Sequence, residues 1–193
     1  MAAKLDRKGF FKSYFCELLA GIDTAFGEEL DGFAEKFPDL IRPPGACNEN
    51  RFIELCSRCG NCVRSCPFFA LKPVMMVNDF DRGTPTLRCG EAFCRFCEQF
   101  PCVTSCPTGA LSTTNPEKLR KIATANCKAV ACLRSGGSDC RACLNSCQES
   151  GYNAISITGD GPPSISPIKC SGCGACAIAC PAYPDTAIIL KPA

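Results

Sequence analysis

The 193-residue sequence predicts an α+β fold, in which small loop–helix–strand units follow an amphipathic helical segment. Three observations lead to this prediction. Dense groups of cysteine recur along the chain, short apolar runs follow these groups, and apolar residues near the N-terminus recur at steps of three and four. Units of this size bury little apolar surface of their own, so something other than apolar side chains must complete their core.

The first 46 residues contain a single cysteine, Cys16, and differ in composition from the rest. Their apolar residues recur at helical spacing and predict an amphipathic helix. These residues are Phe11, Phe15, Leu18, Leu19, Ile22 and Phe26. The run Pro43-Pro44-Gly45 predicts an extended linker. We therefore expect residues 1–46 to form a docking helix and a linker. The alternative is that the helix only covers the core of the cysteine-rich region that follows.

Residues 7–12 resemble a degenerate twin-arginine export signal, with Lys8 in place of the second arginine. Glu17 and Asp23 interrupt the apolar run that such a signal needs. These departures favour a cytoplasmic location, with the periplasm as the alternative. No segment reaches the roughly 20 apolar residues that a membrane-spanning helix requires.

Two groups of cysteine share one spacing, with three thiols within seven residues and a fourth just before a proline. The first group is Cys56, Cys59, Cys62 and Cys66, and the other is Cys170, Cys173, Cys176 and Cys180. Bacterial ferredoxins bind a [4Fe–4S] cluster with this spacing, and the fourth cysteine reaches a second cluster. Gly172 and Gly174 give the loop the backbone freedom that three converging sulfurs require.

Two further groups vary the spacing and make a second and a third unit between these two. They are Cys94, Cys97, Cys102 and Cys106, and Cys132, Cys140, Cys143 and Cys147. The third unit is the least regular, because Gln148 replaces the usual proline and Cys127 competes with Cys132 for the first position. Four units of four use sixteen of the 20 cysteines and predict four [4Fe–4S] clusters. We expect Cys16, Cys47, Cys89 and Cys127 to be buried free thiols.

Two other cysteine chemistries fit the sequence poorly. A disulfide framework scatters its cysteines, whereas here they stand in dense repeated groups without a cleavable secretory signal. Structural zinc sites use separated pairs, often with histidine, and this chain has no histidine. The formal net charge of +2 counts every cysteine as neutral, so a cluster-loaded chain is acidic in effect and nothing indicates nucleic-acid binding.

Several stretches together resemble the polyferredoxin subunits of the periplasmic nitrate reductase and methylamine-utilisation type. They are RPPGA at residues 42–46, FIELCSRCGNCVRSCP, FCRFCEQFPCVTSCPTGAL, the third cysteine unit and CSGCGACAIACP. The chain is similar more broadly to four-cluster subunits that serve molybdenum and tungsten oxidoreductases. The resemblance implies a polyferredoxin domain over residues 47–193, with four clusters that relay electrons to or from a catalytic oxidoreductase subunit.

The resemblance also implies a nested pairing of the units into two ferredoxin-like two-cluster lobes. Lobe A would combine residues 47–88 with 148–193, and lobe B would span 89–147. Each fourth cysteine would complete the cluster of its partner unit. The implied ligand sets are Cys56, Cys59, Cys62 and Cys180; Cys170, Cys173, Cys176 and Cys66; Cys94, Cys97, Cys102 and Cys147; and Cys132, Cys140, Cys143 and Cys106. A sequential pairing, of the first unit with the second and the third with the fourth, stays open.

We therefore predict a non-catalytic electron-transfer subunit of an oxidoreductase complex. Cysteine at all sixteen ligand positions leaves no open iron for a small-molecule substrate. A freestanding soluble polyferredoxin is the alternative, and it would not need the apolar N-terminal segment to dock on a partner. A redox sensor is the third hypothesis, although no DNA-binding or other output segment is visible in the sequence.

Overall fold

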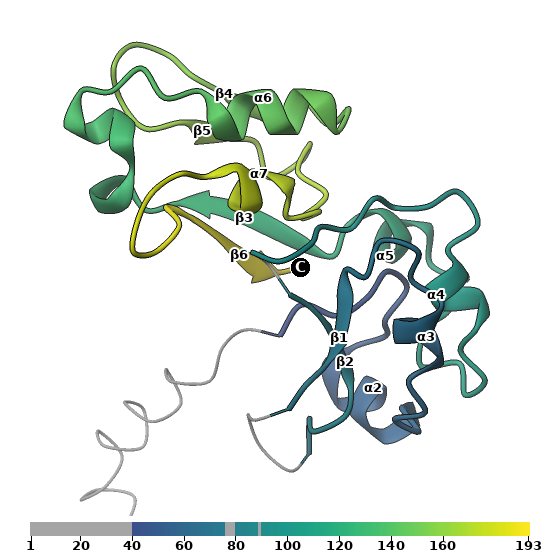
Figure 1. The fold of residues 1–193 in the computed structure, drawn as a ribbon. Coiled ribbons are helices and arrows are strands. Elements are labelled where there is room, and N and C mark those ends of the chain that lie inside the picture. The colour runs from purple at the N-terminus through teal and green to yellow at the C-terminus, as the bar shows by residue number, and fades with distance from the viewer. Residues whose placement is uncertain (1–39, 76–79, 89) are drawn as a thin grey trace, which may run out of the picture. The chain divides into compact units, whose positions relative to one another are not determined.

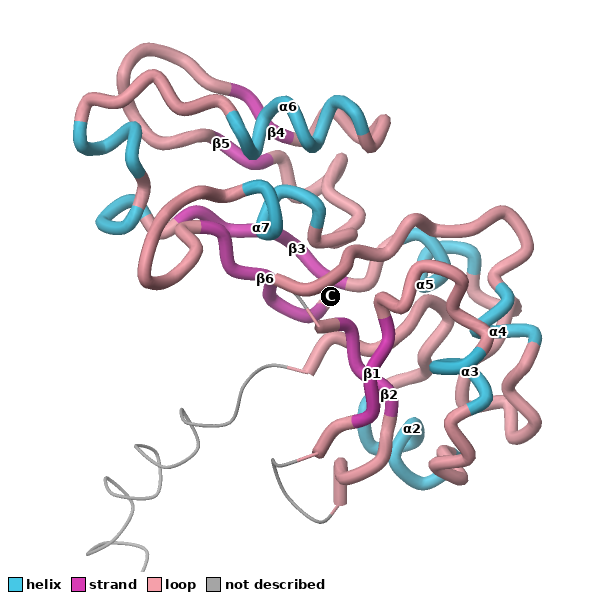
Figure 2. The backbone as a smooth tube through the Cα atoms, in the orientation of Figure 1, coloured by secondary structure: helices cyan, strands magenta, loops and turns pink. Residues whose placement is uncertain are grey.

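The computed structural model describes residues 40–75, 80–88 and 90–193, which belong to one compact unit, Asp39–Ala193 (Figures 1 and 2). The predicted N-terminal helix, the export-like stretch, Cys16 and Cys89 lie outside the described residues. Among the described residues, no helix is both long and apolar enough to cross a membrane.

Short helices and short strands alternate along the described chain and confirm the predicted α+β class. The elements up to residue 120 are α2 (Glu49–Leu55), α3 (Asn61–Arg64), β1 (Leu71–Pro73), β2 (Pro85–Leu87), α4 (Pro101–Thr104) and α5 (Pro116–Arg120). The later elements are β3 (Ala123–Cys127), the 3-10 turns η1 (Ala129–Ala131) and η2 (Leu133–Gly136), α6 (Ala142–Glu149), β4 (Ile155–Ser156), β5 (Ser164–Ile165), α7 (Ala175–Ala179) and β6 (Ile188–Pro192).

The strands pair antiparallel in three two-stranded sheets, β1 with β2, β3 with β6 and β4 with β5. A strand follows the first, third and fourth cysteine units, as the sequence predicts. After the second unit, Leu111 forms an isolated bridge with Ala46. Each sheet is too small to be stable alone, so the strands depend on the packing between units.

The run Asn115-Pro116-Glu117 predicts the start of a helix that continues to about Asn126, and the structure has a shorter one, α5. The Asn115 side chain caps it as expected, accepting hydrogen bonds from the N–H groups of Glu117 and Lys118 at 3.0 and 3.2 Å. The helix ends at Arg120 rather than near Asn126, because residues 123–127 pair with β6 instead.

Helix contacts divide the unit into a first lobe (residues 40–122) and a second lobe (residues 123–193). In the first lobe α3 contacts α4, so the first cysteine unit packs on the second. In the second lobe α6 contacts α7, so the third unit packs on the fourth (Figure 1). This packing contradicts the nested lobes 47–88 plus 148–193 and 89–147. The physical reason is the antiparallel pairing of β1 with β2 and of β4 with β5, which returns the chain to the unit it has just left.

Residues 40–46, expected to be a linker, are part of the first lobe. Ile41, Arg42 and Ala46 are buried there. Gly45 donates its N–H to the Lys118 carbonyl at 3.0 Å and accepts the N–H of Ser112 at 2.9 Å. The folded unit therefore begins near residue 39 rather than at residue 47.

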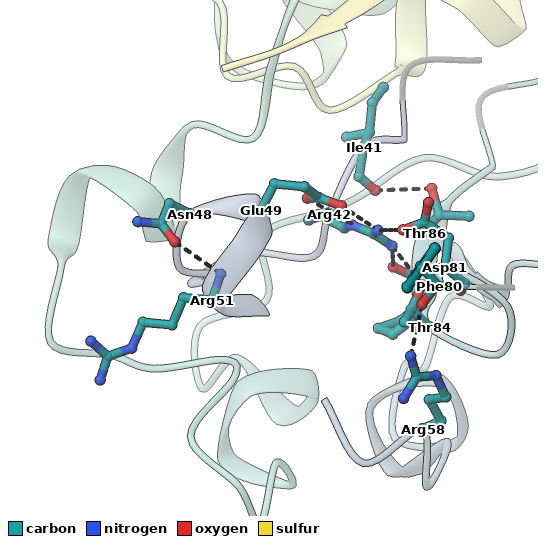
Figure 3. Close-up of polar contacts among 11 residues, drawn as sticks. Ile41, Arg42, Asn48, Glu49, Arg51, Arg58, Phe80, Asp81, Thr84 and Thr86 are labelled. Carbon is teal, nitrogen blue, oxygen red and sulfur yellow. Dashed lines mark hydrogen bonds and ion pairs between the residues drawn. The ribbon is translucent and has the colours of Figure 1, made fainter. Parts of the chain in front are cut away.

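The buried Arg42 side chain ties this entry segment to α2 and to the turn before β2 (Figure 3). Its guanidinium donates to the Glu49 carboxylate, to Asp81 Oδ1 at 2.5 Å and to Thr84 Oγ1 at 2.8 Å. It also lies 4.9 Å from the centre of the Phe52 ring, which is fully buried. Charge-assisted hydrogen bonds in a buried site are strong, so this network holds residues 40–46 against α2 and the turn before β2.

Arg42→Ala is expected to lower the free energy of unfolding of the first lobe by about 3–5 kcal/mol, because it removes the cation from a buried ion pair. The matched control is Arg88→Ala, whose ion pair with Glu91 has side chains 60% and 53% exposed and contributes about 0–1 kcal/mol. Thermal midpoints of the cluster-loaded proteins under anoxic conditions measure the difference. Equal midpoints for the two variants would contradict the structural role of Arg42.

Candidate metal centres

The first site gathers three thiols from the first unit and one from the second. Cys62 is buried on α3, and its pKa is raised to about 11 by that burial and by the charges of Cys56, Cys106 and Cys59. The charge of Cys106 also acts on the Cys59 thiol. Cys106, and not Cys180, therefore lies beside the first unit's own three cysteines.

The second site takes its fourth thiol from the first unit. Cys66, Cys94, Cys97 and Cys102 line one cavity. Burial, followed by the charges of Cys66 and of Cys62 from the neighbouring first site, raises the pKa of the Cys102 thiol to about 12. The first two units thus exchange their fourth cysteines.

The fourth site has the same arrangement in the second lobe. Cys147, Cys170, Cys173 and Cys176 line one cavity. Ala154 donates its backbone N–H to Cys147 Sγ at 3.3 Å, and the Ala125 N–H points at Cys170 Sγ at 3.4 Å. Hydrogen bonds to ligand sulfurs tune the reduction potential of an iron–sulfur cluster, so these N–H groups lie where they would act on a bound cluster.

The third site holds five thiols. Burial raises the pKa of Cys143, and the charges of Cys140, Cys180 and Cys132 add to the rise. Cys127, at the end of β3, lies against Cys132. Burial and the charges of Cys132, Cys143 and Cys180 raise the pKa of Cys127 to about 12. The structure thus brings both candidates for the first position to the same site.

Cys106 lies at the first site and Cys180 at the third. Each precedes a proline, and the two thiols have similar surroundings. Burial acts to raise the pKa of Cys106, but the backbone N–H groups of Leu111, Thr108 and Gly109 lower it on balance. The pKa of Cys180 is lowered in the same way, against its burial, by the Ala182 N–H and the Thr186 hydroxyl. The fold therefore presents both thiols in a form that favours the thiolate.

A left-handed residue precedes the second cysteine in three of the four units. It is Arg58 in the first unit, Phe96 in the second and Gly172 in the fourth, with φ of 56°, 45° and 77°. Only the glycine adopts this conformation without steric cost. Arg58 is held there by hydrogen bonds that its guanidinium donates to the carbonyls of Arg82 at 3.1 Å and Phe80 at 2.7 Å, which Figure 3 shows in part.

The donor sets fit a [4Fe–4S] cluster. The second and fourth sites each gather four thiols from two units around one cavity. Within the described part of the chain, no three cysteine or acidic side chains converge closely enough to hold a single metal ion. A cube of four irons binds one thiolate at each iron and so suits four thiols that surround a cavity.

Family models and known proteins agree with this assignment. A 4Fe-4S dicluster domain matches residues 55–110, and a 4Fe-4S binding domain matches residues 163–183. The methylamine utilization ferredoxin-type protein MauM of Methylophilus methylotrophus is 33% identical over 98% of this chain and 88% of that protein. The chain belongs to the MauM/NapG family of ferredoxin-type proteins. The dicluster match covers the first and second units together, as their packing into one lobe requires.

Other MauM/NapG relatives are longer than the region they share with this chain. MauM of Methylobacillus flagellatus is 36% identical over 71% of this chain and 62% of its own length. The ferredoxin-type protein NapG of Escherichia coli is 33% identical over 72% of this chain and 65% of its own length. No solved structure matches the chain significantly. The chain is thus an iron–sulfur protein of the MauM/NapG family with 4Fe-4S domains.

Proposed function

We propose that the chain holds four [4Fe–4S] clusters with sequential sharing of ligands. The ligand sets are Cys56, Cys59, Cys62 and Cys106 at the first site; Cys94, Cys97, Cys102 and Cys66 at the second; Cys132, Cys140, Cys143 and Cys180 at the third; and Cys170, Cys173, Cys176 and Cys147 at the fourth. The observation that carries the proposal is the pair of cavities, each lined by three cysteines of one unit and the fourth of its neighbour.

In this proposal the chain is a non-catalytic subunit that relays single electrons to or from a catalytic oxidoreductase partner. A bound [4Fe–4S] cluster takes up and releases one electron, and the chain's own residues fix its position and exclude water. Cysteine at every ligand position supports a role without substrate binding. The names of two of its relatives refer to methylamine utilization, which is said of those proteins. Our proposed location is the cytoplasm, as the departures from an export signal suggest.

Anoxic purification tests the proposal directly. We expect about sixteen irons and about sixteen acid-labile sulfides per chain, with about four electrons taken up in a reductive titration. A stoichiometric companion protein in the same preparation supports the partner role, and a monomer without one supports the freestanding carrier instead. Iron for only about two clusters would contradict the proposed four.

The third site gives a separate prediction, because five thiols surround it. The spacing assigns the ligand role to Cys132, so Cys132→Ala is expected to lose about four irons per chain. Cys127→Ala is expected to keep the full iron content, since its thiol lies beside the site without a ligand position. Iron analysis and electron paramagnetic resonance (EPR) of the two variants decide between the thiols. Iron loss in Cys127→Ala alone would reverse the assignment.

A further inference from the structure

The two lobes meet where the second cysteine unit contacts the fourth. The backbone N–H of Cys94 donates to the carbonyl of Cys173 at 2.9 Å, which links a proposed ligand of the second site to one of the fourth. Two residues earlier in the fourth unit, the Ser171 carbonyl accepts the N–H of Ile122, the last residue of the first lobe, at 3.0 Å. Two hydrogen bonds thus hold the fourth unit's loop to the first lobe, and one of them comes from the loop of the second site.

An aromatic pair packs at the same contact. The rings of Phe96, from the second unit's loop, and Tyr152, from the second lobe, lie 6.0 Å apart in an edge-to-face arrangement at 69°. Phe96 lines the cavity of the second site, and Tyr152 lines the cavity of the fourth. Tyr152 therefore lies between the second and fourth sites, and its ring helps to exclude water from the space between them. No spacing in the sequence marked either aromatic residue.

Two glycines let the fourth unit's loop pack closely, Gly172 on the start of β3 and Gly174 on the first lobe. A Cβ on Gly172 would lie 2.4 Å from the backbone nitrogen and oxygen of Ala123. A Cβ on Gly174 would lie 3.7 Å from Phe93 Cβ and 3.9 Å from Leu87, both in the first lobe. The fourth unit's loop thus leaves no room for a side chain at residue 172, and at residue 174 it lies within van der Waals reach of the first lobe.

The first and third sites have their cysteine neighbours within their own lobes. The charges that act on Cys62 come from first-lobe cysteines, and those that act on Cys143 come from second-lobe cysteines. Cys59 of the first site is exposed. The first site therefore neighbours the second through the α3–α4 contact, and the third neighbours the fourth through the α6–α7 contact.

We propose that electrons cross between the lobes at the Cys94–Cys173 contact, so that the four sites form a line in the order first, second, fourth, third. This inference rests on the proposed four-cluster function. Each crossing oxidises the group at one site by one electron and reduces the group at the other by one. An external one-electron reductant and an external oxidant at the two ends supply and remove that electron. The order along the line differs from the order of the units in the sequence.

Two double variants of the full chain test the order. Cys59→Ala/Cys140→Ala retains the second and fourth sites, and Cys97→Ala/Cys173→Ala retains the first and third. Each variant keeps one site per lobe and is expected to hold about eight irons. In the fully reduced proteins, we expect the EPR signals of the first variant to be broadened by spin–spin interaction. The second variant is expected to give the sum of two non-interacting signals.

Interaction in the second double variant, or its absence in a fully loaded first one, would overturn the proposed order. Where a double variant holds fewer irons than expected, two single variants give the answer. In Cys97→Ala the first site is cut off and shows a non-interacting signal, whereas in Cys59→Ala every remaining signal interacts with a neighbour. The reverse pattern counts against the crossing. A wild-type chain without clusters would instead contradict the proposed function itself, so the two failures are distinguishable.

Discussion

Cys66→Ala is expected to remove the cluster from the second site and to leave the first site, in whose loop Cys66 stands, loaded. Cys66 lines the cavity of Cys94, Cys97 and Cys102, and its charge acts on Cys102. The variant should lose about four of about sixteen irons. Iron analysis gives the amount, and EPR of the reduced protein identifies the missing signal by comparison with Cys97→Ala, which removes the second site through its own loop.

The reciprocal variant is the matched control. Cys106→Ala is expected to empty the first site and to preserve the second, because Cys106 lies beside Cys62 and Cys59. The nested pairing makes a different prediction for Cys66→Ala, namely loss of the cluster at Cys170, Cys173 and Cys176. A Cys66→Ala spectrum that lacks the fourth site's signal would therefore restore the nested scheme and contradict the sequential one.

The identity of the thiols that gather at the four sites could be predicted from the sequence because their spacing is a local property. Three cysteines within one tight loop converge wherever that loop folds, so Cys56, Cys59 and Cys62 needed no knowledge of the rest of the chain. The first position of the third unit could not be decided, since Cys127 reaches that site from the end of β3. Strand pairing, rather than spacing, brings it there.

The pairing of the units could not be predicted, because it depends on the segments between them. The resemblance implied nested lobes, but the antiparallel pairs β1–β2 and β4–β5 fold each unit back onto its sequence neighbour. The same kind of tertiary contact shortened the helix after Asn115 and turned residues 123–127 into a strand. Residues 40–46 likewise have the sequence pattern of a linker. Only the hydrogen bonds of Gly45 with Lys118 and Ser112 show that they belong to the first lobe.

Removal of the clusters is expected to abolish the cooperative fold of both lobes. The buried core of the second lobe consists of four cysteines, three alanines and two isoleucines: Cys143, Cys147, Cys170, Cys176, Ala125, Ala154, Ala177, Ile155 and Ile188. Alanine and a bare thiol bury little apolar area, and two isoleucines cannot offset the backbone entropy of a whole lobe. With the clusters bound, the same thiols are anchored to rigid inorganic cores, and metal binding becomes folding free energy.

The test is to strip iron from the full chain anoxically with a chelator and a mild oxidant, then to reduce any disulfides. Far-ultraviolet circular dichroism and the dispersion of methyl signals in NMR should collapse together, and rebuilding the clusters with iron and sulfide should restore both. The first lobe is the more demanding case, because it also contains Phe52, Leu71, Leu87 and Leu111 in its core and the buried Arg42 network. If the stripped chain kept dispersed signals for these residues, apolar packing and ion pairing would suffice to fold the first lobe. Its clusters would then not be needed for its stability.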